Sequence, residues 1–510
     1  MFISRIRLSF QICATLVLAL GFGPVAVAAE EVPTQIPQLT VEASKTIGPL
    51  RNFALDTNTS IRFVPPSELA GRVEAEYGRP TITRVWLPLD DMWDYRDNSY
   101  HFNFEIGQDR YADDKVKYKY DRGVVLSSNV PYYDYLDSFS AHSDYLLLNV
   151  RRYEVEVVKG VIPISKWKEV LKTGLLHYKR RYKNLRYIEA LNEWHVSVFG
   201  GIADKDYYQF YKTCYEVVNE INEELKPEIP LEVGGPNVVG MPLKLEDATG
   251  APQSGNKTLR LYHFFQQYAA DPDPKKRLDF ISFHDYALGK DFSAIRDYES
   301  IVRKFLRDFK LKEDTPIYIT EIGYALESPK SELNQRQATG ISELFYYARA
   351  TSQVHLFPWV LYHEPARQLS LTAFVSGKSL SMTPFGDALK MWSMQKKNEL
   401  QVKWSLPERG LNAVASKDDE TLVLQIWNDS PKTVSLNVNI ASLKSFLGKK
   451  MRIQEYRIDS HHNNVLLNPD HSGPSLTPDG DSISNTGFGN RLVSLEPYSL
   501  LMWRIERLGR

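Results

Sequence analysis

Between about residues 80 and 395, short apolar runs alternate with longer stretches in which apolar residues recur at helical spacing. Continuous apolar runs are typical of strands buried on both faces, and a strand followed by a helix is the repeating unit of a parallel sheet. The predicted strands are 82–89, 145–150, 185–192, 231–235, 279–284, 316–320 and 355–363, and residues 59–66 are a candidate for an eighth.

Four segments between these strands carry the helical pattern: 165–184, 205–226, 297–312 and 334–352. Eight strand–helix units over this length predict an α/β fold, a (β/α)8 TIM barrel with enlarged loops. A doubly wound open sheet is the alternative, but no Gly-x-Gly-x-x-Gly turn follows an early strand.

The pattern changes after residue 395, where apolar and polar residues alternate with a period of two. The alternating segments 411–429, 434–440, 451–459 and 491–505 are separated by turn residues, which predicts a C-terminal antiparallel β-sandwich domain. We therefore expect a catalytic barrel over 30–397 and a β-sandwich over 398–510. Residues 30–60, rich in Pro and Thr, are expected to be an irregular leader.

The N-terminus has the pattern of a secretory signal peptide. Arg5 and Arg7 precede a short apolar run, and small residues end it near Ala28 and Ala29. We expect cleavage there, with residues 1–29 removed and the protein periplasmic or secreted. An uncleaved membrane anchor is the alternative, and no other segment approaches the roughly 20 apolar residues that span a bilayer.

Composition adds little except for its aromatic residues. The chain of 510 residues is 43% hydrophobic and 25% charged with a net charge of −1, so it has no basic surplus for nucleic acid. Its 29 Tyr, 23 Phe and 9 Trp suit a packed core and also suit stacking on sugar rings. Cys13 lies in the predicted signal, which leaves Cys214 without an internal disulfide partner.

Polar residues stand at the ends of several predicted strands, where a barrel has its active site. Asn192 and Glu193 end the fourth strand, and Glu321 ends the seventh. Two carboxyl groups can cleave a glycosidic bond when one donates a proton to the leaving oxygen and the other attacks or activates water. A separation of about 5–5.5 Å gives retention, and about 6.5–9.5 Å gives inversion. Taken singly, either glutamate is equally consistent with a solvated or salt-bridged strand end.

Five segments resemble the clan A glycoside hydrolases, and family 39 most of all, which includes β-xylosidases, α-L-iduronidases and bacterial exopolysaccharide hydrolases. "LNEW" and "YITEIGY" are similar to the acid/base and nucleophile signatures of that family. The other three segments are "TRVWLPLDDMW", "VGGPNVVG" and "DFISFHDYA". The resemblance covers roughly residues 80–395, and a barrel followed by a β domain agrees with it.

The resemblance implies a role for each matching residue. Glu193 would be the general acid/base and Glu321 the nucleophile. Asn192 would bind the hydroxyl next to the reacting carbon. Arg84 and Tyr286 would orient Glu321, His284 would contact sugar hydroxyls, and Trp359 would stack on a sugar face. His284 is also consistent with an ordinary hydrogen-bonded histidine and Trp359 with barrel core, while His195, Tyr362 and His363 are expected to be structural.

The sequence departs from the family pattern at two strands. Leu191 and Trp194 stand where the family usually has Trp and Pro, and Trp86 stands where a His is common. We expect these changes to line the sugar-binding end and to alter the substrate. Loss of the proline is expected to affect the pose of the loop that carries Glu193.

No residue pattern predicts a metal or another cofactor. The chain has no Cys/His spacing for zinc, no calcium loop and no Gly-x-Ser-x-Gly nucleophile elbow. The sequence predicts an exported retaining glycoside hydrolase that acts on a polysaccharide or oligosaccharide. The alternatives are a catalytically silent carbohydrate-binding barrel in exopolysaccharide assembly and a transglycosylase using the same residues. The sequence does not indicate an oligomeric state.

Overall fold

The structure of the protein is a computed structural model, in which Pro37–Arg510 form one compact unit. The predicted signal peptide and His363 lie outside the described residues. The described residues are 36–51, 56–59, 66–105, 130–240, 259–286, 292–323, 332–351, 353–362, 370–374, 380–406, 410–448, 450–470 and 475–508.

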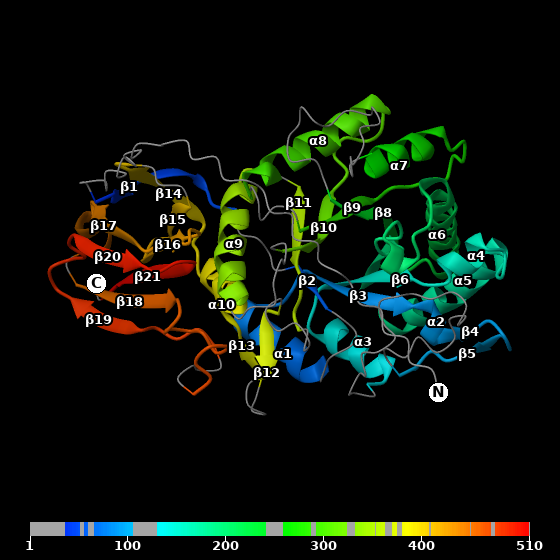
Figure 1. Ribbon diagram of the computed structural model, residues 1–510, viewed down its shortest axis with the longest axis horizontal. Coiled ribbons are helices and arrows are strands. Elements are labelled where there is room, and N and C mark those ends of the chain that lie inside the picture. The colour runs from blue at the N-terminus through cyan, green and yellow to red at the C-terminus, as the bar shows by residue number, and fades with distance from the viewer. Residues whose placement is uncertain are drawn as a thin grey trace, which may run out of the picture. The chain divides into compact units, whose positions relative to one another are not determined.

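A parallel sheet of eight strands forms the barrel, in the order β11-β10-β9-β8-β7-β6-β3-β2 (Figure 1). Four of its strands, β2, β3, β9 and β10, are buried along their whole length, and the other four are buried at all but one or two positions, which explains their largely apolar sequence. The predicted (β/α)8 barrel is confirmed. Its strands are β2 Thr57–Asn58, β3 Ile82–Pro88, β6 Tyr145–Arg151, β7 Leu185–Ala190, β8 Glu232–Val239, β9 Phe280–Asp285, β10 Ile317–Ile322 and β11 Val354–Pro358.

Strand β2 has only two residues, and hydrogen bonds of its Asn58 link it to the segment after β11 and to β10. Leu361 N–H donates to the Asn58 carbonyl at 3.0 Å, and the Asn58 side chain donates to the Thr320 carbonyl at 2.6 Å. The eighth strand therefore lies just before the segment 59–66 that was expected to form it. Residues 60–65 are outside the described part of the chain.

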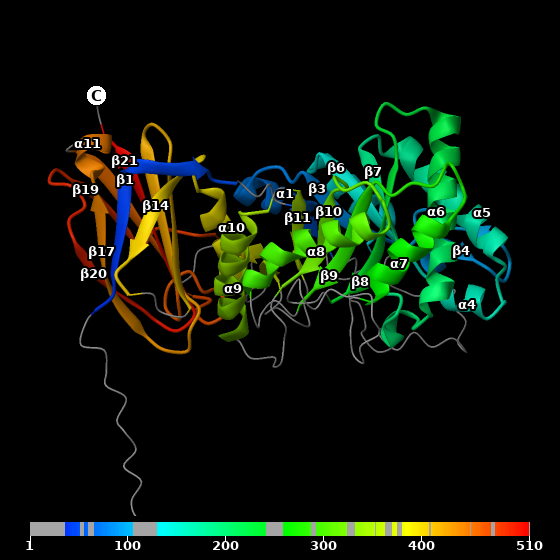
Figure 2. The ribbon, with the colours of Figure 1, turned by 90° about the horizontal axis from the view of Figure 1, so that it is seen from above.

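Helices surround the barrel strands (Figure 2), and α6 illustrates how they pack. Its apolar residues Tyr207, Phe210, Cys214, Val217 and Ile221 recur at helical spacing and are all buried. The four predicted helices are present as α5, α6, α8 and α9. The helices of this part are α1 Pro66–Tyr77, α2 Leu89–Met92, α3 Tyr132–Ala141, α4 Glu154–Val158, α5 Ile164–Arg181, α6 Asp204–Leu225, α7 Leu259–Ala270, α8 Ile295–Asp308, α9 Glu332–Ala348, α10 Pro384–Ser393 and the short η1 Ser197–Phe199 and η4 Phe292–Ala294.

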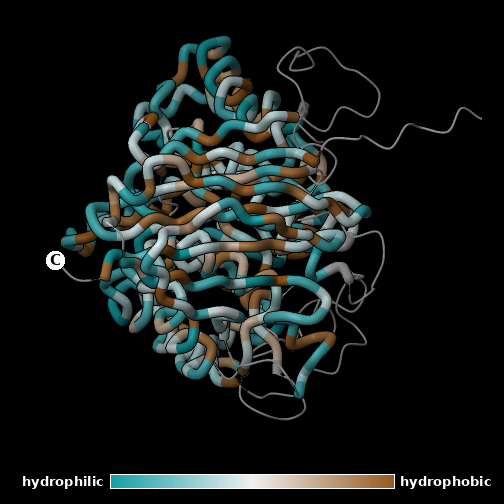
Figure 3. The backbone as a smooth tube through the Cα atoms, turned by 90° about the vertical axis from the view of Figure 1, so that its left-hand side faces the viewer, coloured by the Kyte–Doolittle hydropathy of each residue, from teal (hydrophilic) through white to brown (hydrophobic). Residues whose placement is uncertain are grey.

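The C-terminal domain contains a nine-stranded sheet in the order β19-β18-β21-β16-β15-β14-β1-β17-β20. All of its pairings are antiparallel except that of β1 with β17. Hydrophobic and hydrophilic residues alternate along the strands in Figure 3, as predicted. The strands are β1 Gln38–Pro49, β14 Asn398–Trp404, β15 Leu411–Lys417, β16 Thr421–Asn428, β17 Val434–Ala441, β18 Met451–Ile458, β19 Gly480–Ser484, β20 Arg491–Leu495 and β21 Ser499–Arg507, with helix α11 Leu443–Leu447.

Strand β1 corrects the expectation of an irregular leader over residues 30–60. Leu39, Val41 and Ala43 alternate with more exposed residues and are buried in the core of the C-terminal sheet. β1 lies between β14 and β17, although it precedes the barrel in sequence (Figure 1). Part of the N-terminal region therefore completes the C-terminal sheet, while the domain boundaries at residues 29 and 397 stay predictions.

Polar contacts join the barrel helix α9 to the C-terminal sheet. Thr339 donates to Asp429 at 2.6 Å, and Asn412 donates to Glu343 at 2.6 Å. Two small antiparallel pairs complete the described elements, β4 Trp93–Asp94 with β5 Ser99–Tyr100 and β12 Thr372–Phe374 with β13 Leu380–Met382. Among the described residues, no helix has the length and apolar character needed to cross a membrane.

Candidate active site

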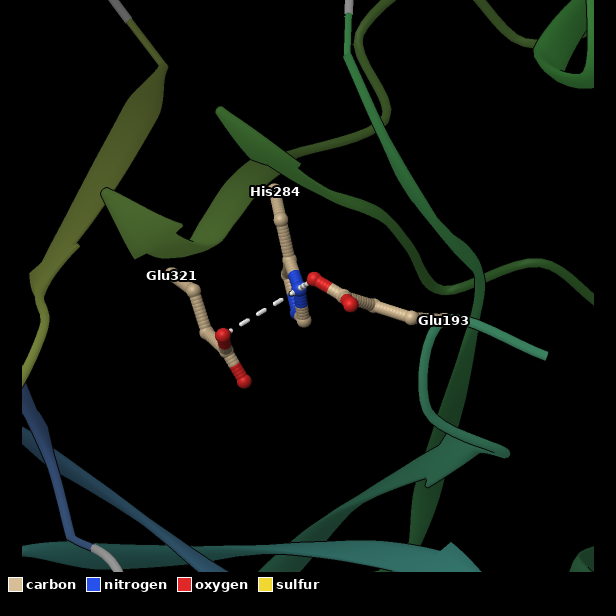
Figure 4. Close-up of side chains that lie close together, drawn as sticks. All are labelled: Glu193, His284 and Glu321. Carbon is tan, nitrogen blue, oxygen red and sulfur yellow. Dashed lines mark hydrogen bonds and ion pairs between the residues drawn. The ribbon is translucent and has the colours of Figure 1, made fainter. Parts of the chain in front are cut away.

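Glu193, His284 and Glu321 converge at the carboxyl ends of barrel strands (Figure 4). His284 Nδ1 lies 2.7 Å from Glu193 Oε1 and 3.4 Å from Glu321 Oε2. One carboxylate oxygen of each glutamate lies within 4.8 Å of the other. The two glutamates that the sequence placed at separate strand ends therefore face the same small space.

Arg84 on β3 lies between several of these groups. Its Nη1 donates to Glu321 Oε1 at 2.8 Å, and its Nη2 donates to Asn192 Oδ1 at 2.9 Å. Its Nε donates to Glu189 Oε2 at 2.7 Å. A guanidinium offers donors along three edges in a fixed plane, and here a different partner occupies each edge. The side chain is fully buried, so these contacts fix its position.

Glu321 is held by two donors, Arg84 and Tyr286. Arg84 contacts Oε1, and the Tyr286 hydroxyl donates to Oε2 at 2.6 Å. Both contacts favour a carboxylate that points into the shared space.

Asn192 has one possible amide orientation in this network. Arg84 has only donors, so the Asn192 atom that faces it must be the oxygen. The Asn192 amide nitrogen is buried and has no hydrogen-bond partner among the described residues. A buried donor without a partner is costly, so this amide nitrogen is a donor left open in the network.

The loop that carries Glu193 is held in a strained conformation. Leu191 and Glu193 have φ values of 59° and 41°, which residues other than glycine rarely adopt. Glu193 N–H donates to the Asn237 carbonyl at 3.1 Å. The Leu191 carbonyl accepts from Asn149 at 2.7 Å and from Asn237 at 2.6 Å. These bonds fix the Glu193 backbone without the family's proline.

Trp194 does not line the sugar-binding end, which corrects the expectation from the sequence. The side chain is 1% exposed, and its Nε1 donates to the Pro236 carbonyl at 2.9 Å. Its ring stacks on Tyr207 of α6, with centroids 4.5 Å apart. The positive φ of Glu193 turns the chain, so Glu193 points to the site while Trp194 enters the core.

Trp359 is half-buried. Its ring stacks on Trp86, with centroids 6.0 Å apart, and the Arg151 guanidinium lies 4.4 Å from the Trp86 centroid. Its backbone N–H donates to the Ile322 carbonyl, one residue after Glu321. Trp359 is thus next to the site, and its role in stacking stays a prediction.

The two residues His195 and Tyr362, expected to be structural, differ from the cluster in their surroundings. Tyr362 is buried in the main core. Burial and the Arg260 charge lower the pKa of His195 to about 4, which keeps its ring neutral near pH 7.

Glu193 and Glu321 share a protonation equilibrium because both are buried and close together. Burial works to raise the pKa of Glu193, but the hydrogen bond and charge of His284 outweigh it and lower that pKa. Burial raises the pKa of Glu321 in spite of the nearby charges of His284 and Arg84. The two pKa values move in opposite directions, so a proton taken up by the pair is favoured on Glu321.

The tautomer of His284 decides whether the cluster suits a metal ion. His284 Nδ1 lies 2.7 Å from Oε1 of the Glu193 carboxylate, which can only accept, so Nδ1 carries a proton. Nδ1–H then donates to Glu193. A metal in the space between the carboxylates would need that nitrogen deprotonated, so the donor set does not fit one. The predicted lack of a cofactor stays a prediction.

Three residues of this network were missed by the sequence reasoning: Glu189, Asn149 and Asn237. Glu189 had a visible signal, since it interrupts the apolar run from Tyr187 to Leu191. Asn149 and Asn237 sit at strand ends like Asn192, but nothing in their sequence shows that they hold the Leu191 carbonyl.

Residues 151–343 match the family model of the glycosyl hydrolases family 39. A monomeric β-xylosidase from Caulobacter crescentus CB15 has a similar structure, with a TM-score of 0.62 and 14% identity over 92% of this chain and 100% of that one. The GH39 enzyme from Xanthomonas axonopodis pv. citri has a TM-score of 0.61 and 13% identity, over 93% of this chain and 98% of that one. A bacterial orthologue of human α-L-iduronidase has a TM-score of 0.58 and 15% identity, over 92% of this chain and 84% of that one. No curated protein matches the sequence.

Proposed function

We propose that this chain, whose residues 151–343 match the family model of the glycosyl hydrolases family 39, is a glycosidase that cleaves its substrate with retention of anomeric configuration. Glu193 is the general acid/base in this proposal and Glu321 is the nucleophile. The observation that carries it is the approach of their carboxylate oxygens to within 4.8 Å. Inverting enzymes keep their carboxyl groups about 6.5–9.5 Å apart to admit water, and retaining enzymes about 5–5.5 Å.

In the first step Glu321 attacks the anomeric carbon and Glu193 protonates the departing glycosidic oxygen. The C–O bond to the leaving group breaks, and a glycosyl ester forms on Glu321. Glu193 must therefore be protonated when substrate is bound. A glycosidic oxygen beside Glu193 accepts a hydrogen bond only from the protonated acid, so substrate binding favours a proton on Glu193 over one on Glu321. His284 Nδ1, within reach of both carboxylates, is placed to stabilise the exchange.

In the second step Glu193, now ionised, removes a proton from water. The water oxygen attacks the anomeric carbon and releases Glu321 as a carboxylate. The His284 N–H then stabilises whichever oxygen of Glu193 carries charge. If a sugar hydroxyl replaces water, the same residues carry out transglycosylation, and product analysis distinguishes the two.

Asn192 is assigned to the hydroxyl next to the reacting carbon. Its amide nitrogen lacks a partner among the described residues, and Arg84 keeps that nitrogen turned away from itself. A hydrogen bond to this hydroxyl strengthens as positive charge develops on the ring, so it lowers the barrier.

The proposed substrate is a polysaccharide or oligosaccharide outside the cytoplasm. The basic and apolar N-terminus supports export, and the half-buried Trp359 supports stacking on a sugar. The silent-barrel alternative rested on the changes at the fourth strand, and the anchored Glu193 backbone argues against it. Export is tested by expressing the full chain, locating the product and sequencing its N-terminus. A periplasmic or secreted product beginning before residue 28 would contradict cleavage at 28–29.

The catalytic roles are tested with Glu193→Gln and Glu321→Gln. Glu193→Gln should lower kcat about 10²–10⁴-fold on substrates with poor leaving groups, the usual contribution of a general acid. Activated aryl glycosides should be affected less. A 2-fluoro glycoside should label Glu321, read by peptide mass spectrometry. Labelling of another residue, or full activity of either variant, would overturn the assignment. The matched control is Glu232→Gln, which changes a half-buried glutamate of β8 that pairs with Arg186.

A further inference from the structure

Glu189 is a fully buried carboxylate near the site, and the two-step reaction does not use it. It lies on β7, four residues before Glu193, and its side chain is fully buried. A carboxylate in that position is costly unless several donors surround it. Its partners therefore indicate what it does.

Each Glu189 oxygen accepts from an element that carries a site residue. Oε1 accepts from the Thr320 hydroxyl at 2.7 Å, and Thr320 directly precedes Glu321 on β10. Oε2 accepts from Arg84 Nε at 2.7 Å and from Asn149 at 2.9 Å. Asn149 also holds the carbonyl of Leu191, in the bend before Glu193. One carboxylate thus ties together β3, β6, β7 and β10 beneath the reacting groups.

The contact with Arg84 has an electrostatic consequence. Arg84 is one positive charge in contact with two buried carboxylates, Glu189 and Glu321, and its ion pairs with them are 2.7 and 2.8 Å long. The attraction that Arg84 exerts on Glu321 is partly balanced by the negative charge of Glu189. A carboxylate paired with an uncompensated cation is less basic and attacks carbon less readily.

We propose that Glu189 is a positioning residue for the proposed glycosidase reaction, which holds Arg84 by its Nε edge and offsets part of the Arg84 charge so that Glu321 stays an effective nucleophile. This inference rests on the role given to Glu321 above. Glu189 does not touch substrate; it acts through Arg84 and Thr320.

The charged and titratable groups around this unit come from several elements. Glu321 faces Arg84 from β3, His284 from β9, Tyr286 after β9 and Glu193 after β7. Glu189 faces Arg84 and His284, and Tyr207 from α6 lies close enough to be affected by its charge. Burial works to raise the pKa of Glu189, but Arg84, His284 and the Thr320 hydrogen bond outweigh it and lower that pKa. Glu189 is therefore ionised when Glu321 is in its working state.

Glu189→Gln removes the charge while keeping the shape. The amide oxygen can face Arg84 and Asn149, and the amide nitrogen can donate to the Thr320 hydroxyl, which also accepts. Arg84 then has Glu321 as its one close counter-ion among these groups. We expect the acidic limb of the kcat/KM profile to move down by roughly 0.5–1 pH unit. We also expect kcat/KM at the optimum to fall about 10-fold, with little change in KM.

Glu189→Asp separates charge from position. It keeps the negative charge but is too short to contact both Arg84 and Thr320, so it should leave the acidic limb near its wild-type position and lower kcat. Glu232→Gln, in which an adjacent strand loses a glutamate paired with Arg186, is the matched control and should change neither. A role in stability alone would change the melting temperature of Glu189→Gln and leave the pH profile in place.

A measurement without turnover keeps the inference separate from the proposed function. In protein labelled with ¹³C at the glutamate carboxyl carbons, the Glu321 signal is assigned by its absence in Glu321→Gln. Its titration midpoint should be lower in Glu189→Gln than in the wild type. An unchanged midpoint overturns the role of Glu189 even if the wild type is an active retaining glycosidase. A lowered midpoint in a protein that cleaves no glycoside supports the charge sharing while the proposed function fails.

Discussion

Arg84 and Glu321 form an ion pair inside the barrel, with Nη1 2.8 Å from Oε1 and both side chains buried. Their strands are not neighbours in the sheet, so the pair crosses the interior. A buried pair of this kind is stable only when each group has further hydrogen bonds, and Arg84 has them on its two other edges. The positions of Glu321 and Asn192 thus depend on one guanidinium.

Arg84→Lys should lower kcat/KM about 10²–10³-fold. Lysine keeps the charge but presents it at one point, so it cannot bind Glu189, Glu321 and Asn192 together. A misplacement of about 1 Å at a reacting group is enough for a loss near 10²-fold. Steady-state kinetics and thermal unfolding should be measured together. The control Arg186→Lys, at a half-buried ion pair with Glu232, should keep full activity. Activity of Arg84→Lys within two-fold of wild type would show that the three separate contacts of the Arg84 guanidinium are not needed.

Trp194→Phe should destabilise the protein without changing its substrate preference. The indole N–H donates to the Pro236 carbonyl, and phenylalanine leaves that buried oxygen unsatisfied at a cost of about 1–3 kcal/mol. Thermal unfolding should show a lower Tm, and relative kcat/KM values over a panel of glycosides should not change. A change in the ranking of the glycosides by kcat/KM would show that Trp194 affects substrate recognition after all.

The barrel was predictable because its strands are buried on both faces, which produces apolar runs with visible ends at Glu193 and Glu321. Strand β2 has only two residues and shows no periodicity. Strand β1 pairs with β14 and β17, both distant in sequence, so its partners are not readable locally.

The site was predictable in its residues and less so in its contacts. Strand ends identify Asn192 and Glu193, but the side on which Trp194 lies depends on the positive φ of Glu193. The three donors to Glu189 come from β3, β6 and β10, and only the register of the folded barrel brings them together.

Glu343 should make stability depend on pH. Glu343 is on α9 and accepts a hydrogen bond from Asn412 of the C-terminal sheet. Burial raises the pKa of Glu343 to about 7. The folded state therefore keeps a proton that the unfolded chain loses near pH 4.5, so the stability contributed by Glu343 is fully present below that pH and is lost as the pH rises through about 7. The loss is of order 1–3 kcal/mol. Urea unfolding of Glu343→Gln at pH 5 and pH 8 should show a smaller difference between the two than wild type does.

The control for that comparison is Glu313→Gln, at an exposed glutamate beside Arg307. It should leave the dependence of the unfolding free energy on pH as it is in wild type. An equal pH dependence in Glu343→Gln and wild type would place the titrating group elsewhere.

Asn192→Ala should remove recognition of one sugar hydroxyl. The Asn192 amide nitrogen is buried, lacks a partner among the described residues and is turned from Arg84, so it is the donor available to the hydroxyl next to the reacting carbon. That hydrogen bond supplies several kcal/mol in the transition state, so kcat/KM on a normal glycoside should fall about 10²–10³-fold. On the matching 2-deoxy glycoside the variant and wild type should be nearly equal, since neither can make the bond. Asn219→Ala, at a half-exposed asparagine of α6, should behave like wild type on both substrates. An equal loss on both substrates in Asn192→Ala would mean that Asn192 acts by positioning Arg84 and does not bind the hydroxyl.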